Sequence, residues 1–198
     1  MIPQRRSSRL GAVLRDLIEA VVLAAVLFLV LQFTLQNTIV EGASMEPNLV
    51  DRQWLLVNKV AYRLGEPERG DVIVFHAPDQ PGKDFIKRII GLPGETIRIQ
   101  DGRATVDGEA LDEPWAPRWD ASNYGPYTVP ADQYFVLGDN RMRSNDSRTW
   151  NGAGGGLEAE QIVGKAWLSV WPRETWGPVR ADAPGPARGL FEPPVASP

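Results

Sequence analysis

One stretch near the N-terminus constrains the fold of this chain more than any other feature, because it is apolar on every side. Residues 17–35 contain a single charged side chain, Glu19, and the next charge follows only at Glu41. A surface helix of a soluble domain shows a polar stripe along one face, and this stretch has none. As a helix, it would be about 28 Å long, close to the roughly 30 Å hydrocarbon core of a bilayer. We therefore predict a transmembrane anchor over residues 17–35.

Two other interpretations of this stretch stay open. A buried helix of a soluble domain is compatible with it, because the most apolar part of the stretch is short. A cleaved signal peptide is the third interpretation, and it requires small residues three positions and one position before the cut. The best candidates for these positions, Val40 and Gly42, fit that requirement poorly, so an uncleaved anchor is favoured.

The basic residues of the N-terminal segment give the anchor a direction. Residues 1–16 hold four arginines and one aspartate. Because basic residues flank the cytoplasmic side of membrane spans, this pattern predicts a cytoplasmic N-terminus over residues 1–16. The chain after the anchor is then an extracytoplasmic body held at the cell membrane by one pass.

Composition removes several classes of function. The chain has no cysteine and one histidine, which excludes disulfides, a thiol nucleophile and a cysteine-based zinc site and leaves a histidine metal site improbable. We expect no metal and no cofactor. The net charge of −4 argues against a nucleic-acid partner. Nothing in the sequence indicates the oligomeric state, for which a monomer is the working expectation.

The pattern after Val40 is that of short strands separated by turns. Asp101-Gly102 lies between two alternating runs and is a strong hairpin signal. No segment beyond the anchor shows a helical period of comparable strength, so the body is predicted to be mainly β, with folded-over antiparallel sheets. The expected strands cover residues 54–57, 71–75, 85–90, 96–99, 104–106, 127–129, 134–137 and 162–171.

The body is predicted to end at Trp171. Residues 172–198 hold seven of the 17 prolines, and proline cannot donate to the hydrogen bonds of a sheet, so this segment is expected to be a flexible tail. The glycine-rich residues 151–156 are expected to form a mobile loop. The β domain thus spans residues 36–171.

Three polar segments are candidates for chemistry. In residues 42–47, Gly-Ala-Ser-Met-Glu-Pro, small residues before Ser44 allow a substrate to approach the backbone closely, although a plain turn with Ser44 as a helix cap explains the segment equally. In the strand 84–90, side chains alternate between faces, so Lys87 or the adjacent Arg88 must lie on the better-buried face. Burial lowers the pKa of a lysine and allows it to act as a general base; an edge lysine that reaches water is the alternative.

The third segment, residues 137–148, is almost wholly polar and follows an apolar strand. A hydrogen-bonded loop near a site and a solvated surface loop both fit it. Asp139 and Asp146 are neighbours of several arginines, which favours structural ion pairs over a catalytic carboxylate pair. A triad of Ser44, His76 and an aspartate is formally available, but a histidine beside Ala-Pro at a strand end is typically a surface residue.

Together these segments resemble type I signal peptidases, the membrane-anchored serine–lysine proteases. The resemblance covers residues 15–171, and its specificity comes from several motifs in order after an anchor. The motifs are Ser44-Met45-x-Pro47, Gly70-Asp71-Val72-Ile73-Val74-Phe75, Lys87-Arg88-Ile89-Ile90-Gly91-Leu92-Pro93-Gly94, Gly138-Asp139-Asn140-Arg141 and Ser144-x-Asp146-Ser147-Arg148.

The resemblance implies a fold of the signal-peptidase type and a role for each matching residue. Ser44 matches the nucleophile, Lys87 the general base and Ser144 the serine that orients the lysine. Asp146 and Arg148 match a supporting ion pair, and Asp139 and Arg141 are expected to hold the loop. By analogy, shallow substrate pockets would be lined by Val40, Met45, Leu49, Phe85 and Ile86.

Three positions depart from the family pattern. Gly42 stands where some members carry a serine that donates to the oxyanion, so the oxyanion hole would depend on the Ser44 amide and on another donor. Arg143 replaces the usual asparagine before Ser144, and Asn48 replaces the usual threonine after Pro47. These departures put local geometry in doubt rather than the chemistry.

The resemblance thus implies a serine endopeptidase that cleaves N-terminal signal peptides from exported preproteins through an acyl-enzyme. Its partners would be these preproteins and the lipid bilayer. Tryptophans of the body are one expected contact with the bilayer, with core packing as the alternative for each: Trp115, Trp119, Trp167, Trp171 and Trp176. A catalytically inactive anchored scaffold of the same fold is the alternative, and it predicts loss of the nucleophile or the base. A self-cleaving serine–lysine repressor would need a DNA-binding domain where this chain has its apolar stretch.

Overall fold

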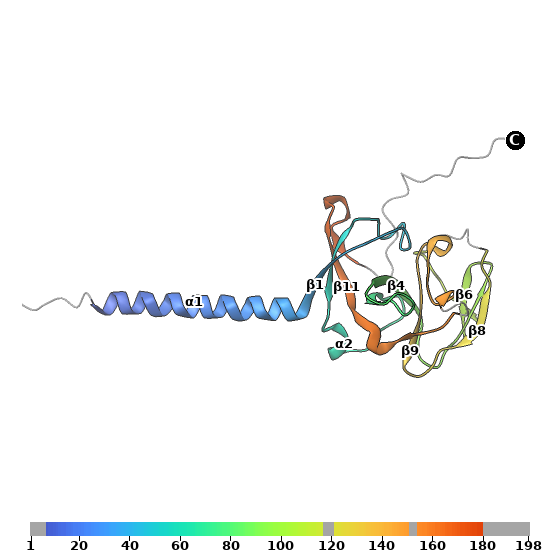
Figure 1. The fold of residues 1–198 in the computed structure, drawn as a ribbon, viewed down its shortest axis with the longest axis horizontal. Helices are drawn as coiled ribbons and strands as arrows, with labels where there is room; N and C mark the ends of the chain where they lie inside the picture. The colour runs from blue at the N-terminus through green and yellow to red at the C-terminus, as the bar shows by residue number, and fades with distance from the viewer. Residues whose placement is uncertain (1–6, 117–120, 151–153, 180–198) are drawn as a thin grey trace, which may run out of the picture.

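The computed structural model describes residues 7–116, 121–150 and 154–179, with side chains from residue 11 onward. A long helix projects from a β body (Figure 1). The helices are α1 (Ser7–Thr34) and α2 (Ala61–Leu64), with short 3-10 turns η1 (Arg141–Arg143), η3 (Ala159–Gln161) and η4 (Arg173–Thr175). The strands are β1 (Leu35–Ile39), β2 (Trp54–Asn58), β3 (Val72–His76), β4 (Asp84–Gly91), β5 (Thr96–Gln100), β6 (Arg103–Val106), β7 (Glu109–Ala110), β8 (Tyr124–Thr128), β9 (Gln133–Leu137), β10 (Leu157–Glu158), β11 (Ile162–Trp171) and β12 (Gly177–Pro178).

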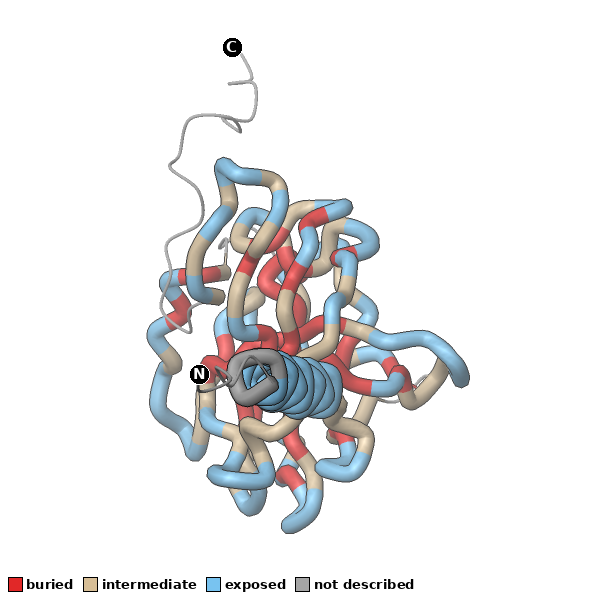
Figure 2. Tube along the Cα trace, turned by 90° about the vertical axis from the view of Figure 1, so that its left-hand side faces the viewer, coloured by how far each residue is buried: buried red, intermediate tan, exposed pale blue. Residues whose placement is uncertain are grey.

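Helix α1 makes almost no use of its apolar surface within the molecule. Its stretch Gly11–Thr34 is long and apolar enough to cross a membrane, and none of it is buried. Figure 2, which looks along the helix, shows the coloured part of it as exposed. The helix begins ten residues before the predicted anchor and ends at Thr34, where the chain turns directly into β1. Lys59 caps this end, because its backbone N–H donates to the Thr34 carbonyl oxygen over 2.9 Å.

The body confirms the prediction of a mainly β fold with antiparallel sheets. The larger sheet has the order β1-β2-β11-β3-β4-β9-β10, with β12 beside β11, and the smaller sheet has the order β7-β6-β5-β8. All strand pairs are antiparallel. Strand β1 was not predicted, because its polar residues Gln36, Asn37 and Thr38 hide the strand pattern that pairing with β2 imposes.

The folded body continues past the boundary predicted at Trp171. Pro178 lies in the short edge strand β12, opposite Leu168 of β11, where a missing N–H is tolerated because the outer side of the strand has no partner strand. Residues 180–198 of the predicted tail and residues 151–153 of the predicted mobile loop lie outside the described residues.

Apolar side chains pack on both faces of the larger sheet. One buried cluster joins the turn after β1 to β2, β3 and β4 and includes Met45, Leu55 and Val74. A second cluster joins the smaller sheet to β4 and β9 and includes Ile97 and Phe135. A third cluster, on the opposite face of β3 and β4, includes Ile73 and Ile89. Strand β4 therefore lies between packed layers, and its side chains are buried whichever face they occupy.

Candidate active site

Ser44 lies in the turn that connects β1 to β2. The turn is closed by two hydrogen bonds, from Leu49 N–H to the Met45 carbonyl oxygen (2.9 Å) and from Arg52 N–H to the Val40 carbonyl oxygen (2.8 Å). Met45 is buried in the core and fixes the turn to the sheet. From the other side, the Asn140 N–H donates to the Ser44 carbonyl oxygen over 3.0 Å. The backbone of Ser44 is thus held by two separate parts of the chain.

Lys87 extends from β4 to this serine. Its ammonium group donates to Ser44 Oγ over 2.9 Å and to the Ile86 carbonyl oxygen over 3.0 Å. The Lys87 residue is only 3% exposed, and its Nζ lies 5.1 Å from the centre of the Phe85 ring. Burial lowers the pKa of Lys87 to about 8, against the opposing effect of nearby carboxylates. A lysine in this environment is partly neutral near physiological pH and is able to accept a proton.

Arg88, on the opposite face of β4, is buried as well, with 1% exposure. The alternation of the strand suggested that one of the two cations would occupy the better-buried face, but both faces are covered. Arg88 forms a bidentate pair with Asp139, with distances of 2.8 Å to Oδ1 and 2.7 Å to Oδ2. Asn48 Nδ2 donates to the same carboxylate over 2.7 Å. Asn48, one of the three residues that differ from the family pattern, therefore connects the turn that carries Ser44 to the loop after β9.

The other predicted ion pairs of that loop are present in part. Arg148 pairs with Asp146 over 2.9 Å, and Asp146 also accepts the Gly138 N–H over 3.1 Å. Arg141 pairs with Glu113, which the sequence analysis did not identify, rather than with an aspartate of its own loop. Asp139 and Arg141 thus hold the loop through partners far away in the sequence.

Ser144 lies beside the site without the contact that the resemblance implies. Its buried Oγ has no hydrogen-bond partner among the described residues, and Lys87 Nζ donates to Ser44 and Ile86 instead. The Ser144 hydroxyl is nevertheless close to the turn that carries Ser44. Both Ser144 Oγ and the Ser44 carbonyl oxygen pack against Gly138, so closely that a Cβ at this glycine would collide with each of them. The orienting role of Ser144 therefore stays a prediction.

Gly42 precedes Ser44 with a backbone φ of +83°, a conformation that favours glycine. Its N–H donates to Asp51 Oδ1 over 2.8 Å, so this amide already has a partner. The Ser44 N–H has no hydrogen-bond partner in the described part of the chain and is the available backbone donor for an oxyanion.

The five residues expected to line substrate pockets separate into two groups. Val40, Met45, Leu49 and Ile86 pack together in one buried cluster. Phe85 is half-buried on the other side of β4 and packs in a different cluster, where its ring contacts Phe75 at 6.3 Å between centres. The structure therefore brings four of the five together.

His76 is not part of the site. It is exposed, and its Nδ1 lies 2.8 Å from Asp84 at the start of β4. Among the described residues, no group of three or more histidine, aspartate or glutamate side chains is placed to hold a metal ion.

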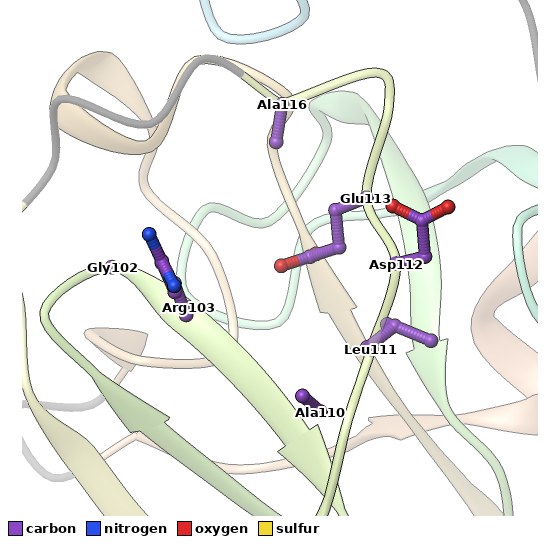
Figure 3. A pocket seen from close by; sticks show the side chains of 7 residues that line it. All are labelled: Gly102, Arg103, Ala110, Leu111, Asp112, Glu113 and Ala116. Atoms are coloured by element: carbon purple, nitrogen blue, oxygen red, sulfur yellow. The ribbon is translucent and has the colours of Figure 1, made fainter.

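One cavity lies away from Ser44 and Lys87, beside the smaller sheet. Its volume is about 270 Å³, and Figure 3 shows Glu113 directed inward from the segment that follows β7, towards the strand of Arg103. Glu113 also pairs with Arg141, so the cavity lies next to the ion pair that holds the loop after β9. It is lined by Gly102, Arg103, Ala110, Leu111, Asp112, Glu113 and Ala116.

Comparisons with known proteins show the family to which the chain belongs. A family model described as signal peptidase, peptidase S26, matches residues 14–171. The probable signal peptidase I-2 of Synechocystis is 41% identical over 156 residues, covering 76% of this chain and 70% of the relative. Signal peptidase I of Leptolyngbya laminosa is 35% identical over 178 residues, 86% of each chain, and that of Bacillus licheniformis is 35% identical over 166 residues, 78% of this chain and 87% of the relative.

A crystal structure of a signal peptidase I from Enterococcus faecalis is 32% identical, with a TM-score of 0.43 over 50% of this chain and 95% of that chain. The curated relatives carry the name of an active peptidase and give no support to an inactive scaffold. The chain therefore belongs to the signal peptidase family, peptidase S26, and is a serine endopeptidase that cleaves signal peptides.

Proposed function

We propose that Ser44 and Lys87 perform this cleavage as a nucleophile and its general base. The observation that carries the proposal is the 2.9 Å hydrogen bond between Lys87 Nζ and Ser44 Oγ, with the lysine almost fully buried. Neutral Lys87 removes the proton of Ser44 while Oγ attacks the scissile carbonyl carbon. The protonated lysine then donates that proton to the leaving amine, which leaves an acyl-enzyme.

Hydrolysis of the acyl-enzyme uses the same pair. Lys87, again neutral, takes a proton from water as the water oxygen attacks the ester carbonyl. Collapse of the intermediate breaks the bond to Ser44 Oγ, which recovers its proton from Lys87. The Ser44 N–H supports the negative oxygen of both tetrahedral intermediates. All of these groups come from one chain, so a monomer suffices for the chemistry.

We further propose that residues 1–16 are cytoplasmic and that the β body, residues 36–179, lies on the extracytoplasmic side of the membrane. The four arginines of residues 1–16 support this direction. Strands β2 and β11, which follow β1 in the order of the larger sheet, and the segment next to β12 carry exposed aromatic side chains, which suit a membrane interface. They are Trp54 on β2, Trp167 and Trp171 on β11, and Trp176 next to β12. Of the other tryptophans considered for this role, Trp115 is buried and Trp119 lies outside the described residues.

The proposal is tested by cleavage of a purified signal-peptide-bearing preprotein by the full chain in phospholipid vesicles. The parent protein is expected to release the mature protein, and Ser44→Ala is expected to release none above background. The matched control is Thr128→Ala, an exposed hydroxyl residue on β8 of the smaller sheet, whose side chain contacts Thr96 and no residue of the proposed site. Processing by Ser44→Ala at the parent rate would overturn the proposed nucleophile.

The pH dependence of cleavage follows from the pKa of Lys87. Below about pH 8 the lysine is protonated in the folded enzyme and cannot accept the proton of Ser44. We therefore expect kcat/KM to rise tenfold per pH unit at low pH and to level off above about pH 8. An unperturbed lysine would move the upper end of this acid limb to about pH 10.4. Initial rates in a series of buffers of constant ionic strength measure the limb, and a limb near 10 would contradict a desolvated base.

The membrane orientation can be measured directly because the chain contains no cysteine. Two single-cysteine variants, Ser8→Cys before the anchor and Lys83→Cys in the exposed turn between β3 and β4, are exposed to a membrane-impermeant maleimide in intact cells. We expect labelling of Lys83→Cys before cell disruption and labelling of Ser8→Cys only after it. The reverse pattern would place the β body in the cytoplasm.

A further inference from the structure

The turn between β3 and β4 brings a carboxylate to the loop that follows β9. Asp79 in this turn accepts a hydrogen bond from Asn145 Nδ2 over 2.8 Å. Asn145 is held in turn by Thr149, whose Oγ1 donates to Asn145 Oδ1 over 2.8 Å. Since Asn145 is flanked by Ser144 and Asp146, the contact fixes Asp79 against the polar loop that packs on the proposed dyad.

The second oxygen of this carboxylate is in an unusual position. Asp79 Oδ1 is buried and has no hydrogen-bond partner among the described residues, although buried polar atoms in native proteins are nearly always paired. The side chain also forms no ion pair in the described part of the chain. Lys83, the cation of the same turn, donates to Gln80 instead.

Lys87 faces carboxylates from two elements. Asp139 and Asp146 come from the loop after β9, and Asp79 comes from the β3–β4 turn. Asp139 is paired with Arg88, and Asp146 is paired with Arg148, so an arginine compensates each of these charges. Asp79 is the member of the three whose charge has no such cation.

We propose that Asp79 is a further positioning residue of the enzyme: a carboxylate that Asn145 holds near the base and that stabilises the protonated form of Lys87. The inference deepens the proposed function, because it takes Lys87 as the base. The charge of Asp79 opposes the lowering of the Lys87 pKa by burial, with a smaller effect than Asp146 or Asp139, because an ammonium group near a carboxylate gives up its proton less readily. Asp79 thus keeps the lysine from becoming too weak a base.

Asp79→Asn tests the proposal with little change in shape, since the new amide oxygen can still accept from Asn145. Removal of the negative charge favours neutral Lys87, so we expect the acid limb of kcat/KM to move down by about half a unit to one unit. Asn145→Ala keeps the charge but releases it towards solvent, and a smaller shift in the same direction is expected. The matched control is Asp84→Asn in the same hairpin, where the exposed carboxylate binds His76 and no shift is expected.

The pH profile separates this role from a structural one. If Asp79 only braced the turn, Asp79→Asn and Asn145→Ala would lower the thermal stability and leave the limb in place, and that result would overturn the inference. A titration of Lys87 by ¹³C NMR in lysine-labelled Ser44→Ala and Ser44→Ala/Asp79→Asn proteins measures the same shift without turnover. An unchanged Lys87 pKa there refutes the inference alone, whereas full activity of Lys87→Ala refutes the proposed dyad.

Discussion

Lys87→Ala is expected to lower kcat/KM for a signal-peptide substrate by about 10²- to 10⁴-fold, the range for loss of a general base. The reason is the single contact that activates Ser44: its Oγ accepts from Lys87 Nζ, and His76, the only histidine, is elsewhere on the surface. Ser44→Ala should lose a similar factor. The double variant should be no worse than either single one, because the two groups act as a unit.

Lys87→Arg distinguishes proton transfer from simple charge. An arginine keeps a positive charge and a similar length, but its guanidinium stays protonated and cannot act as a base. We expect this variant to be as inactive as Lys87→Ala, as measured by single-turnover cleavage in vesicles. Activity of Lys87→Arg within tenfold of the parent would show that the lysine acts only electrostatically.

The loss of activity should not come with a loss of stability. The folded-state pKa of Lys87, about 8, lies below the ordinary lysine value of 10.5. Below pH 8 the lysine is protonated in both states, and burial of the charge then destabilises the fold by at most about 3 kcal/mol. This cost disappears as the pH rises from 8 to about 10.5. Lys87→Met is therefore expected to unfold at a higher temperature than the parent at pH 7, which also serves as the folding control for the inactive variants.

The sequence carried enough information to predict most strands and to single out Ser44 and Lys87, which the structure brings within 2.9 Å of each other. Ser44 and Lys87 stand in ordered motifs after an apolar stretch, and several strands alternate or end in Asp-Gly or Pro-Gly turns that act locally. Such signals depend on neighbours along the chain, so they can be read without the tertiary structure. Strand β1 carries no such signal, because β2 alone determines its pairing.

The supporting contacts could not be predicted, because they join residues far apart in sequence. Asp79 occupies a Pro-Asp-Gln-Pro segment that is typical of a surface turn, and its partner Asn145 is 66 residues away. The partner of Arg88 was equally hidden: strand alternation assigns faces, but it does not say that both faces of β4 are covered. Asp139 was instead interpreted as a partner of nearby arginines, because only local neighbours were visible.

The buried pair of Arg88 and Asp139 gives the second large expected effect. Each side chain is 1% exposed, so Asp139→Ala leaves a guanidinium without a carboxylate in the interior. We expect a loss of about 3–5 kcal/mol in the free energy of unfolding, measured by denaturant titration in detergent. Asp84→Asn removes a carboxylate from an exposed pair and is the control, with an expected change below about 1 kcal/mol.

A double variant separates the cost of an unpaired charge from the value of the pair itself. Arg88→Met/Asp139→Leu removes both charges, and since a buried ion pair often contributes little beyond apolar packing, it should be more stable than Asp139→Ala. It also leaves Asn48 Nδ2 without its bond to Asp139, although that nitrogen keeps its bond to the Trp115 carbonyl oxygen. A double variant less stable than Asp139→Ala would contradict this interpretation. That result would mean that the attraction between Arg88 and Asp139 itself stabilises the serine turn and β4. The pair would then do more than prevent one buried charge from lacking the other.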